Sequence, residues 1–499
     1  METQIKDLKY WQARRAALAI EGRAFIDGMY RHARSHETFD CVSPGDATVL
    51  ARVEACNAAD VDDAVSAARR AFDANVWAGL NPRDRKATLL RWAALVREHA
   101  DELALLETLD AGKPIADTTT VDVPGAAYCI EWFAEAIDKF GGEVAPADHH
   151  LVGLVTHEPI GVVAAVVPWN FPLLMAAWKF APALAAGNSV VLKPSEKSPL
   201  TAIRVAQLAL EAGIPAGVFN VLPGGGEAGK ALALHGDVDC IAFTGSTQVG
   251  KQIMQYAGAS NLKRVWLELG GKSPNIVLPD CPDLDRAAKT AADAIFYNMG
   301  EMCTAGSRLL VHRDIKDAFL DRLIDASRRY APGNPLDPST AMGAIIDQAQ
   351  LDRVLGYIEA GRREATLLLG GSRAPAIEGG FYIEPTIFDT SHGDARIARE
   401  EIFGPVLSVI TFDTLDEAVR VANASDYGLA AAVWTADLTT AHEVSRKLRA
   451  GTVWVNCYDE GGDMNFPFGG YRQSGNGRDK SLHALEKYTE LKSTLIRLR

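Results

Sequence analysis

The sequence has few cysteines, and their spacing fits neither a disulfide framework nor a zinc site. Its 499 residues include seven cysteines, an odd number, which lie far apart and contain no CxxC pair. No run approaches the length of about 18 apolar residues that spans a bilayer. The first seven residues include two acids and no apolar run, which is not typical of a signal peptide. These absences predict a protein of the reducing cytoplasm that holds no metal.

The sequence also lacks blocks of like charge. Its net charge of −13 is spread along the chain, which argues against nucleic acid or an anionic membrane as a partner. A cationic or neutral small molecule fits this charge better. The hydrophobic content of 48% and charged content of 23% are ordinary for a folded, soluble protein. At the usual domain size, the length suggests about two to four domains.

Helical patterns alternate with short apolar segments through most of the chain, which is typical of an α/β fold. Residues 60–76 and 83–110 have the spacing of amphipathic helices. From about residue 160 the pattern becomes strand, loop, helix, and the successive βαβ units predict a parallel, doubly wound sheet. We expect its strands at 161–167, 189–192, 218–222 and 240–243, and its first helices at 171–186 and 201–212.

A second α/β region begins near residue 271, with expected strands at 275–278, 307–311 and 406–412. Two segments fit neither region. Residues 144–159 have the pattern of a hairpin, and residues 487–499 alternate polar and apolar side chains as a strand does. Because neither has a core of its own, we expect both to pack on something else, plausibly another subunit.

Three side chains could together attack a carbonyl group. Cys303 lies among small, flexible residues, Glu268 precedes two glycines, and Asn170 follows a predicted strand. A thiol, a carboxylate base and an amide donor are the groups that covalent attack on a carbonyl requires. Each also has a simpler interpretation. Cys303 could be a small buried hydrophobic residue, Glu268 an exposed acid at a strand end, and Asn170 a helix N-cap.

Several strand ends carry residues suited to a dinucleotide. Residues 224–229 match GxGxxG and include Gly226, but no ribose-binding acid follows at the usual distance of about 20 residues. Gly245 and Ser246 form a better phosphate seat, although they could equally be an ordinary capped helix. Lys193 and Glu196 follow another strand, and a carboxylate there would accept from ribose hydroxyls and repel a 2′-phosphate. This interpretation favours NAD over NADP. The alternative is that Lys193 and Glu196 form only a surface ion pair.

Taken together, seven segments resemble the NAD(P)-dependent aldehyde dehydrogenase superfamily, in order and spacing, from about residue 25 to residue 492. A chance match to all seven is not credible. The segments are Pro168-Trp169-Asn170-Phe171-Pro172, Leu192-Lys193-Pro194-Ser195-Glu196, Phe243-Thr244-Gly245-Ser246, Leu267-Glu268-Leu269-Gly270-Gly271-Lys272, the stretch 296–306 around Cys303, Glu401-Ile402-Phe403-Gly404-Pro405 and Pro467-Phe468-Gly469-Gly470.

The resemblance implies roles for individual residues. Cys303 resembles the nucleophile, Asn170 the oxyanion donor, and Glu268 the base that activates the thiol or the deacylating water. It also implies a bound NAD, with the glycine-rich loop beside the adenine. The implied cofactor ligands are Lys193 and Glu196 at the adenine ribose, Ser246 and Trp169 at the pyrophosphate, Glu401 at the nicotinamide ribose, and the accompanying Gly226, Gly245 and Phe403.

The resemblance further implies three structural parts. They are a Rossmann-type cofactor domain at 1–140 and 160–270, a catalytic domain at 271–472, and a β-arm at 141–159 and 487–499. In this family such an arm joins subunits, so a homotetramer, a dimer of dimers, is expected.

Within the family, several stretches, the longest at 473–487, are similar to the bacterial γ-glutamyl-γ-aminobutyraldehyde dehydrogenases of putrescine breakdown. This implies oxidation of that aldehyde or of other ω-amino or guanidino aldehydes. A broad-specificity aliphatic aldehyde dehydrogenase and a thiol hydrolase or esterase using Cys303 remain as alternatives. The presence of Cys303, Glu268 and Asn170 argues against a binding protein that has kept the fold and lost the catalytic activity.

For the substrate we expect an aromatic tunnel lined by Phe171, Trp178, Met302 and Phe468. Met302 departs from the family pattern, as does Glu301 before it, and Arg472 replaces the usual lysine. Asp122 and Glu131 are hypothesised to attract a cationic tail at the tunnel mouth, because they follow 112–114 on a helical segment of an acidic protein.

Overall fold

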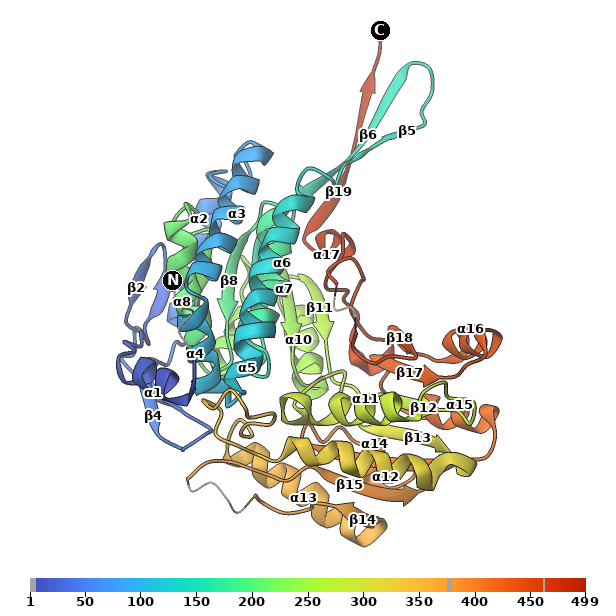
Figure 1. Ribbon diagram of the computed structural model, residues 1–499. Helices are drawn as coiled ribbons and strands as arrows, with labels where there is room; N and C mark the ends of the chain where they lie inside the picture. The colour runs from blue at the N-terminus through green and yellow to red at the C-terminus, as the bar shows by residue number, and fades with distance from the viewer. Residues whose placement is uncertain (1–5, 375–378, 461–462) are drawn as a thin grey trace, which may run out of the picture.

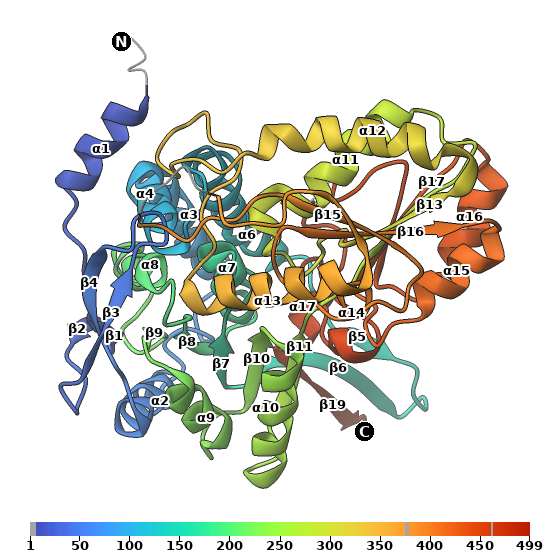
Figure 2. The same cartoon turned by 90° about the horizontal axis from the view of Figure 1, so that it is seen from below.

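The computed structural model describes residues 6–374, 379–460 and 463–499. Two large sheets with their helices lie side by side, and a narrow β-arm projects from them (Figure 1). The same arrangement is seen from below in Figure 2. The predicted α/β class, with two sheets and an arm, is confirmed.

The first sheet has seven strands, and five consecutive strands, counted from one edge, are parallel. Alternate residues of its central strand face two different hydrophobic cores: Val163 and Ala165 belong to one, Val162 and Ala164 to the other. A strand buried on both faces needs apolar side chains throughout, as predicted from its sequence. In sheet order the strands are β11 (Arg264–Glu268), β10 (Cys240–Thr244), β7 (Val162–Val166), β8 (Ser189–Lys193), β9 (Phe219–Val221), β1 (Ala24–Ile26) and β2 (Met29–Arg31).

Helices cover both faces of this sheet. The helix after β7 begins with Pro172 at its first position, where the missing N–H costs nothing, and it ends before Gly187, whose φ is +100°. One face is covered by α3 (Pro82–Glu98), α4 (Ala100–Ala111), α6 (Val123–Ala136), α7 (Pro172–Ala185) and α8 (Leu200–Glu211), and the other by α2 (Ala58–Asp73), α9 (Gly226–Leu234) and α10 (Thr247–Ala259).

The single helix predicted at 83–110 was wrong, because the structure divides it into α3 and α4. The chain leaves helical geometry at His99, where φ is −94° and ψ is 19°. Helix α3 buries one stripe, whereas every residue of α4 from Leu103 onward is buried. The break lets the second helix leave the surface and enter the core.

The second sheet also has seven strands, six of which are parallel and one of which, at an edge, is antiparallel. In sheet order they are β14 (Thr366–Leu369), β15 (Thr386–Ser391), β16 (Val406–Phe412), β13 (Arg308–His312), β12 (Pro274–Val277), β17 (Ala430–Trp434) and β18 (Thr452–Val455). The helices of this region are α11 (Leu284–Phe296), α12 (Lys316–Ser327), α13 (Gln348–Glu364), α14 (Arg396–Arg399), α15 (Leu415–Asn423) and α16 (Leu438–Lys447).

The predicted hairpin and C-terminal strand form one small sheet. Strand β6 (Leu151–Pro159) pairs with β5 (Glu143–Ala145) on one side and with β19 (Thr489–Arg497) on the other. The short helix α17 (His483–Glu486) leads into β19, and the arm extends beyond both large sheets (Figure 1). The N-terminal part adds α1 (Leu8–Ala16) and the hairpin of β3 (Thr38–Val42) and β4 (Val49–Glu54).

Candidate active site

The carboxyl ends of the first sheet bring the predicted site residues together. In the parallel register Val166 pairs with Lys193, and Thr244 pairs with Glu268. Trp169 and Asn170 directly follow β7, so they lie at this same edge. Ligands of open α/β sheets bind at such an edge, which explains why residues distant in sequence converge here.

The nucleophile loop is held in a strained backbone conformation. Before Cys303, in the 3₁₀ turn η2 (Tyr297–Gly300), Asn298 and Met299 have φ angles of 47° and 56°. Each costs about 1–2 kcal/mol for a residue with a Cβ. Gly300, at φ 70°, packs so closely on the chain that a Cβ would lie 2.4 Å from the carbonyl of Gly404. Strain of this kind clusters at functional sites because the surroundings must enforce it.

Asn170 is tied to this loop by its side chain and by its backbone. Its Nδ2 donates to the carbonyl of Glu301 at 2.8 Å. Its own carbonyl accepts from Nδ2 of Asn298 and from Nζ of Lys113, each at 3.1 Å. An amide nitrogen has two hydrogens, so the contact with Glu301 leaves one for a substrate oxygen near Cys303.

Glu268 ends β11 and is 3% exposed. Neither carboxylate oxygen has a hydrogen-bond partner among the described residues. Its Oε1 lies against Gly469 and Gly477, where added Cβ atoms would come within 2.8 and 3.0 Å. Burial, and then the neighbouring Asp479 carboxylate, raise the pKa of Glu268 well above its usual value. An unpaired buried carboxyl with a raised pKa suits a general base.

A cavity of about 480 Å³ reaches Cys303. All four side chains expected in the tunnel, Phe171, Trp178, Met302 and Phe468, line it, and the rings of Trp178 and Phe468 lie 5.1 Å apart. Glu268 is not among the lining residues, so it must turn to reach the reacting carbon. Several further lining residues were not predicted from the sequence, and they include Tyr128, Leu174, Met175, Asp293, Tyr297, Arg329, Tyr330, Tyr458, Asp459, Met464 and Lys480.

The hypothesis that Asp122 and Glu131 attract a substrate tail was wrong. Asp122 is completely buried, and its Oδ1 accepts from Nζ of Lys113 at 2.9 Å. The same ammonium lies 3.5 Å from the centre of the Phe171 ring. Glu131 lies on the surface, paired with Arg97. Neither acid lines the cavity, because the π-helical turn η1 (Thr118–Asp122) directs Asp122 inward.

Asp122→Ala is therefore expected to weaken the fold. Removing one partner leaves the Lys113 ammonium buried and unpaired, which costs about 3–5 kcal/mol of unfolding free energy. Glu131→Ala is the control, since breaking an exposed pair with Arg97 costs at most about 1 kcal/mol. Urea denaturation measures both. Equal stability of the two variants would contradict a structural role for Asp122.

Some expected cofactor residues lie at this sheet edge, and Glu401 and Phe403 reach it from the second sheet. Ser246 caps α10 by accepting from the N–H of Val249 at 3.3 Å. Glu401 accepts from the N–H of Gly271 at 3.0 Å. The rings of Trp169 and Phe403 meet edge to face with centroids 5.2 Å apart.

The adenine side of this region is open. Lys193 is 4% exposed, with Nζ 3.7 Å from the half-exposed carboxylate of Glu196. A Cβ on Gly226 would meet no atom within 4 Å, whereas on Gly245 it would lie 2.5 Å from the Phe243 ring. The open glycine loop, the exposed acid and the capped helix start fit a dinucleotide with its ribose and phosphate groups.

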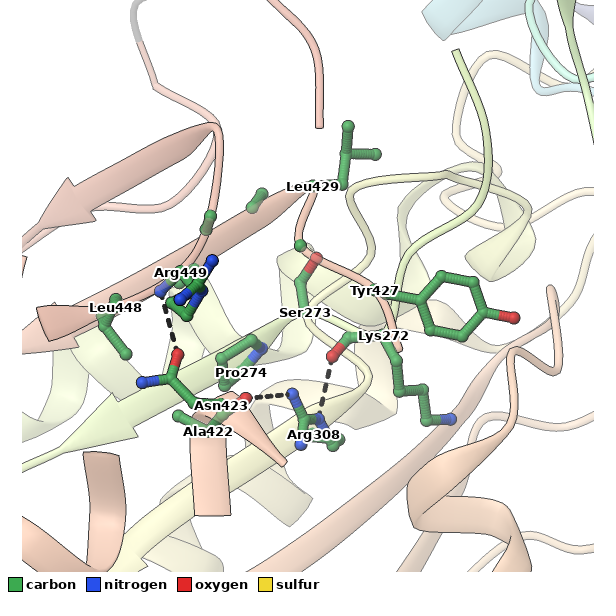
Figure 3. A pocket seen from close by; sticks show the side chains of 14 residues that line it. Lys272, Ser273, Pro274, Arg308, Ala422, Asn423, Tyr427, Leu429, Leu448 and Arg449 are labelled. Carbon is green, nitrogen blue, oxygen red and sulfur yellow. Dashed lines mark hydrogen bonds between the residues drawn. The ribbon is translucent and has the colours of Figure 1, made fainter. Parts of the chain in front are cut away.

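A small pocket behind the site is a structural feature (Figure 3). Its volume of about 10 Å³ holds no more than one water. Arg308 donates to the carbonyls of Lys272, Val421 and Ala422 at 2.8–3.0 Å, and burial lowers the pKa of Lys272 to about 7. These bonds fix the segment that follows Glu268.

Comparison with known proteins decides the family. The model described as "Aldehyde dehydrogenase family" matches residues 30–494. The chain belongs to the aldehyde dehydrogenase family. It is 55% identical to the "NADP/NAD-dependent aldehyde dehydrogenase PuuC" of Escherichia coli K12, over 98% of this chain and 99% of that protein.

Solved structures of aldehyde dehydrogenases share the whole fold. One is γ-glutamyl-γ-aminobutyraldehyde dehydrogenase from Burkholderia cenocepacia, 80% identical with a TM-score of 0.98, covering 99% of this chain and 100% of that one. Another is a mutant of the P. syringae indole-3-acetaldehyde dehydrogenase AldA in complex with NAD+ and IAA, 62% identical with a TM-score of 0.98 and the same coverage.

Two features are absent from the described part of this aldehyde dehydrogenase. Within the described ranges no helix is long and apolar enough to cross a membrane. The same part of the chain has no cluster of three or more His, Cys, Asp or Glu side chains that could hold a metal ion.

Proposed function

We propose that this enzyme uses NAD to oxidise γ-glutamyl-γ-aminobutyraldehyde, or a related ω-amino or guanidino aldehyde, to its acid in polyamine breakdown. The observation that carries the proposal is the cavity of about 480 Å³, which ends at Cys303 beside the tethered Asn170 loop. An elongated aldehyde fits such a cavity with its carbonyl at the sulfur. The 80% identity to a structure named for this substrate supports the choice.

The first chemical step is attack by the sulfur of Cys303. Burial, and then the nearby Glu401 carboxylate, raise the pKa of the thiol, so a base must remove its proton. The sulfur bonds to the carbonyl carbon, and the carbonyl oxygen takes the electron pair. Asn170 then donates to this oxyanion, a contact typically worth about 3–4 kcal/mol in the transition state.

Release of the acid completes the cycle. When bound, NAD accepts the hydride that leaves the aldehyde carbon. The carbonyl carbon then remains bonded to sulfur as a thioester. Glu268, turned toward the cavity, takes a proton from water, the hydroxyl bonds to the carbon, and the bond to sulfur breaks.

The cofactor would be held by the residues gathered at the sheet edge. Lys193 and Glu196 would bind the adenine ribose, with Gly226 and Gly245 leaving space for the backbone to approach. Trp169 and Ser246 would bind the pyrophosphate, and Glu401, flanked by Phe403, the nicotinamide ribose.

Glu196→Gln is expected to reduce the preference for NAD over NADP. The carboxylate is half-exposed, so its repulsion of a 2′-phosphate amounts to about 1 kcal/mol at close range in water. The ratio of kcat/KM for the two cofactors should therefore fall by about fivefold. Glu211→Gln, at the exposed end of α8, should leave the ratio unchanged. An unchanged ratio in Glu196→Gln would remove this carboxylate from the ribose site.

A substrate panel tests the proposed function. It comprises γ-glutamyl-γ-aminobutyraldehyde, 4-aminobutyraldehyde, 4-guanidinobutyraldehyde, succinic semialdehyde and butanal, each with NAD and NADP, followed by NADH or NADPH absorbance. We expect the highest kcat/KM for γ-glutamyl-γ-aminobutyraldehyde or for one of the amino or guanidino aldehydes. Equal values across the panel would indicate a broad-specificity enzyme. Ester hydrolysis without aldehyde-dependent NADH would indicate a thiol hydrolase.

We also propose that the β-arm, 141–159 and 487–499, joins subunits of a cytoplasmic homotetramer. The division into a cofactor domain at 1–140 and 160–270 and a catalytic domain at 271–472 accompanies this proposal. The support is the arm's exposed apolar surface: Leu491 and Leu495 are each 66% exposed and Val144 is 77% exposed. Sedimentation equilibrium measures the assembly, and a monomer at all concentrations would reject the proposal.

A further inference from the structure

Three polar side chains form a connected cluster on one wall of the substrate cavity. Asp293 comes from α11, and Arg329 and Tyr330 come from the turn η4 (Arg328–Tyr330) that follows α12. Helices α11 and α12 pack against each other, which brings the cluster together (Figure 1). Nη2 of Arg329 lies 2.8 Å from Oδ1 of Asp293 and donates to the Tyr330 hydroxyl at 2.7 Å. That hydroxyl donates to Oδ1 of Asp293 at 2.9 Å.

The cluster keeps both charges accessible to a ligand. The Arg329 and Asp293 side chains are 46% and 39% exposed, which places them toward the cavity mouth. Within the described residues, the hydrogen bonds of Arg329 use Nη2 and those of Asp293 use Oδ1. A ligand can therefore bind the atoms that these bonds leave unused, which are Nε and Nη1 of Arg329 and Oδ2 of Asp293. Tyr330 is 2% exposed and holds the two charged groups in place.

Fold stability alone gives no reason for this ion pair. Partly exposed pairs contribute about 0–1 kcal/mol, and the cavity wall is otherwise largely aromatic and aliphatic. A simple alkyl aldehyde would gain nothing from a cation and an anion side by side. A ligand that itself carries both charges on substituents of one carbon would gain two charge-assisted hydrogen bonds.

The γ-glutamyl group has such an end. Its α-carbon bears a carboxylate and an ammonium, at the opposite end of the molecule from the aldehyde. A guanidinium presents planar donors that match a carboxylate, and a carboxylate accepts from an ammonium. The remaining charged lining residues, Asp459 and Lys480, are a second pair of opposite charges that attract each other. They differ from the cluster in that Nζ of Lys480 lies over the rings of Trp178 and Phe468, at 4.9 and 5.9 Å.

We propose that Asp293 and Arg329 form a subsite for the α-amino-acid end of the aldehyde substrate. Arg329 binds the α-carboxylate, Asp293 binds the α-ammonium, and Tyr330 fixes the distance between them. The aldehyde end then reaches Cys303, which lines the same cavity. This inference rests on the proposed function and adds the residues that distinguish a γ-glutamyl aldehyde from a simple aminoaldehyde.

The test combines two variants of the full-length enzyme with matched aldehydes. The aldehydes are γ-glutamyl-γ-aminobutyraldehyde, its analogue without the α-amino group, its α-carboxamide analogue, and butanal. For each preparation, kcat/KM is divided by the value for butanal, so a partly unfolded fraction cancels. Arg329→Gln should lower the γ-glutamyl ratio by about tenfold, mainly through KM, and leave the ratio for the carboxamide unchanged. Asp293→Asn should lower it similarly and leave the ratio for the deamino analogue unchanged.

An ion pair between helices α11 and α12 supplies the control. Arg322 and Asp285 lie 2.6 Å apart and do not line the cavity, so Arg322→Gln and Asp285→Asn should leave every ratio unchanged. The subsite is rejected if Arg329→Gln leaves the γ-glutamyl ratio unchanged. It is also rejected if Asp459→Asn, and not Asp293→Asn, removes the difference in kcat/KM between the γ-glutamyl aldehyde and its analogue without the α-amino group. If the wild-type enzyme does not oxidise the γ-glutamyl aldehyde, the γ-glutamyl form of the proposed function is rejected, and the subsite is rejected with it.

Discussion

Cys303→Ser is expected to lower the rate of aldehyde-dependent NADH formation by about 10⁵-fold, the scale seen when a catalytic nucleophile is removed. A serine hydroxyl is a much weaker nucleophile than a thiolate at neutral pH, and no adjacent side chain in the described cavity is arranged to replace the sulfur. Steady-state NADH formation with excess aldehyde measures the change. NAD binding, followed by quenching of tryptophan fluorescence, should persist because the cofactor residues are untouched.

The control for this experiment is a cysteine outside the cavity. Cys281 is partly exposed and also unpaired, but it does not line the substrate cavity. Cys281→Ser should therefore leave kcat and KM unchanged. If Cys303→Ser kept more than about a tenth of the activity, covalent catalysis through this thiol would be excluded.

The sequence was informative where one physical rule decides the structure. Residues 161–167 have no polar side chain, and only a strand buried on both faces needs that, so β7 and its neighbours were correctly predicted. Parallel strands place their carboxyl ends at one edge, so the sequence predicts ligand residues at strand ends such as Asn170 and Lys193, and the structure adds Glu268 at the end of β11.

The sequence was misleading where tertiary contacts override local pattern. An acid on a helical segment usually faces water, but the π-helical turn η1 directs Asp122 to buried Lys113. The helix break at His99 could not be predicted, because no Pro or Gly lies at that position. The contact of Arg329 with Asp293 could not be predicted either, because Asp293 lies 36 positions away on another helix. The direction in which Glu268 points is a rotamer choice, which no sequence pattern specifies.

Glu268→Gln is expected to slow turnover by about 10³-fold through loss of general-base catalysis. If the base acts on the deacylating water, the thioester still forms, so a rapid burst of about one NADH per active site should precede the slow steady state. Stopped-flow absorbance measures the burst. Glu486→Gln, an exposed carboxylate on α17, should behave as wild type.

The pH dependence tests the same residue independently. The base acts as a carboxylate, and burial raises the pKa of Glu268 well above its usual value. Wild-type kcat should therefore fall as pH decreases through a pKa higher than that of an ordinary glutamate, because protonation removes the active form. Glu268→Gln cannot ionise and should lack this limb of the profile. Loss of the burst would instead assign Glu268 to activation of the Cys303 thiol, and an unchanged profile would assign the titration to another group.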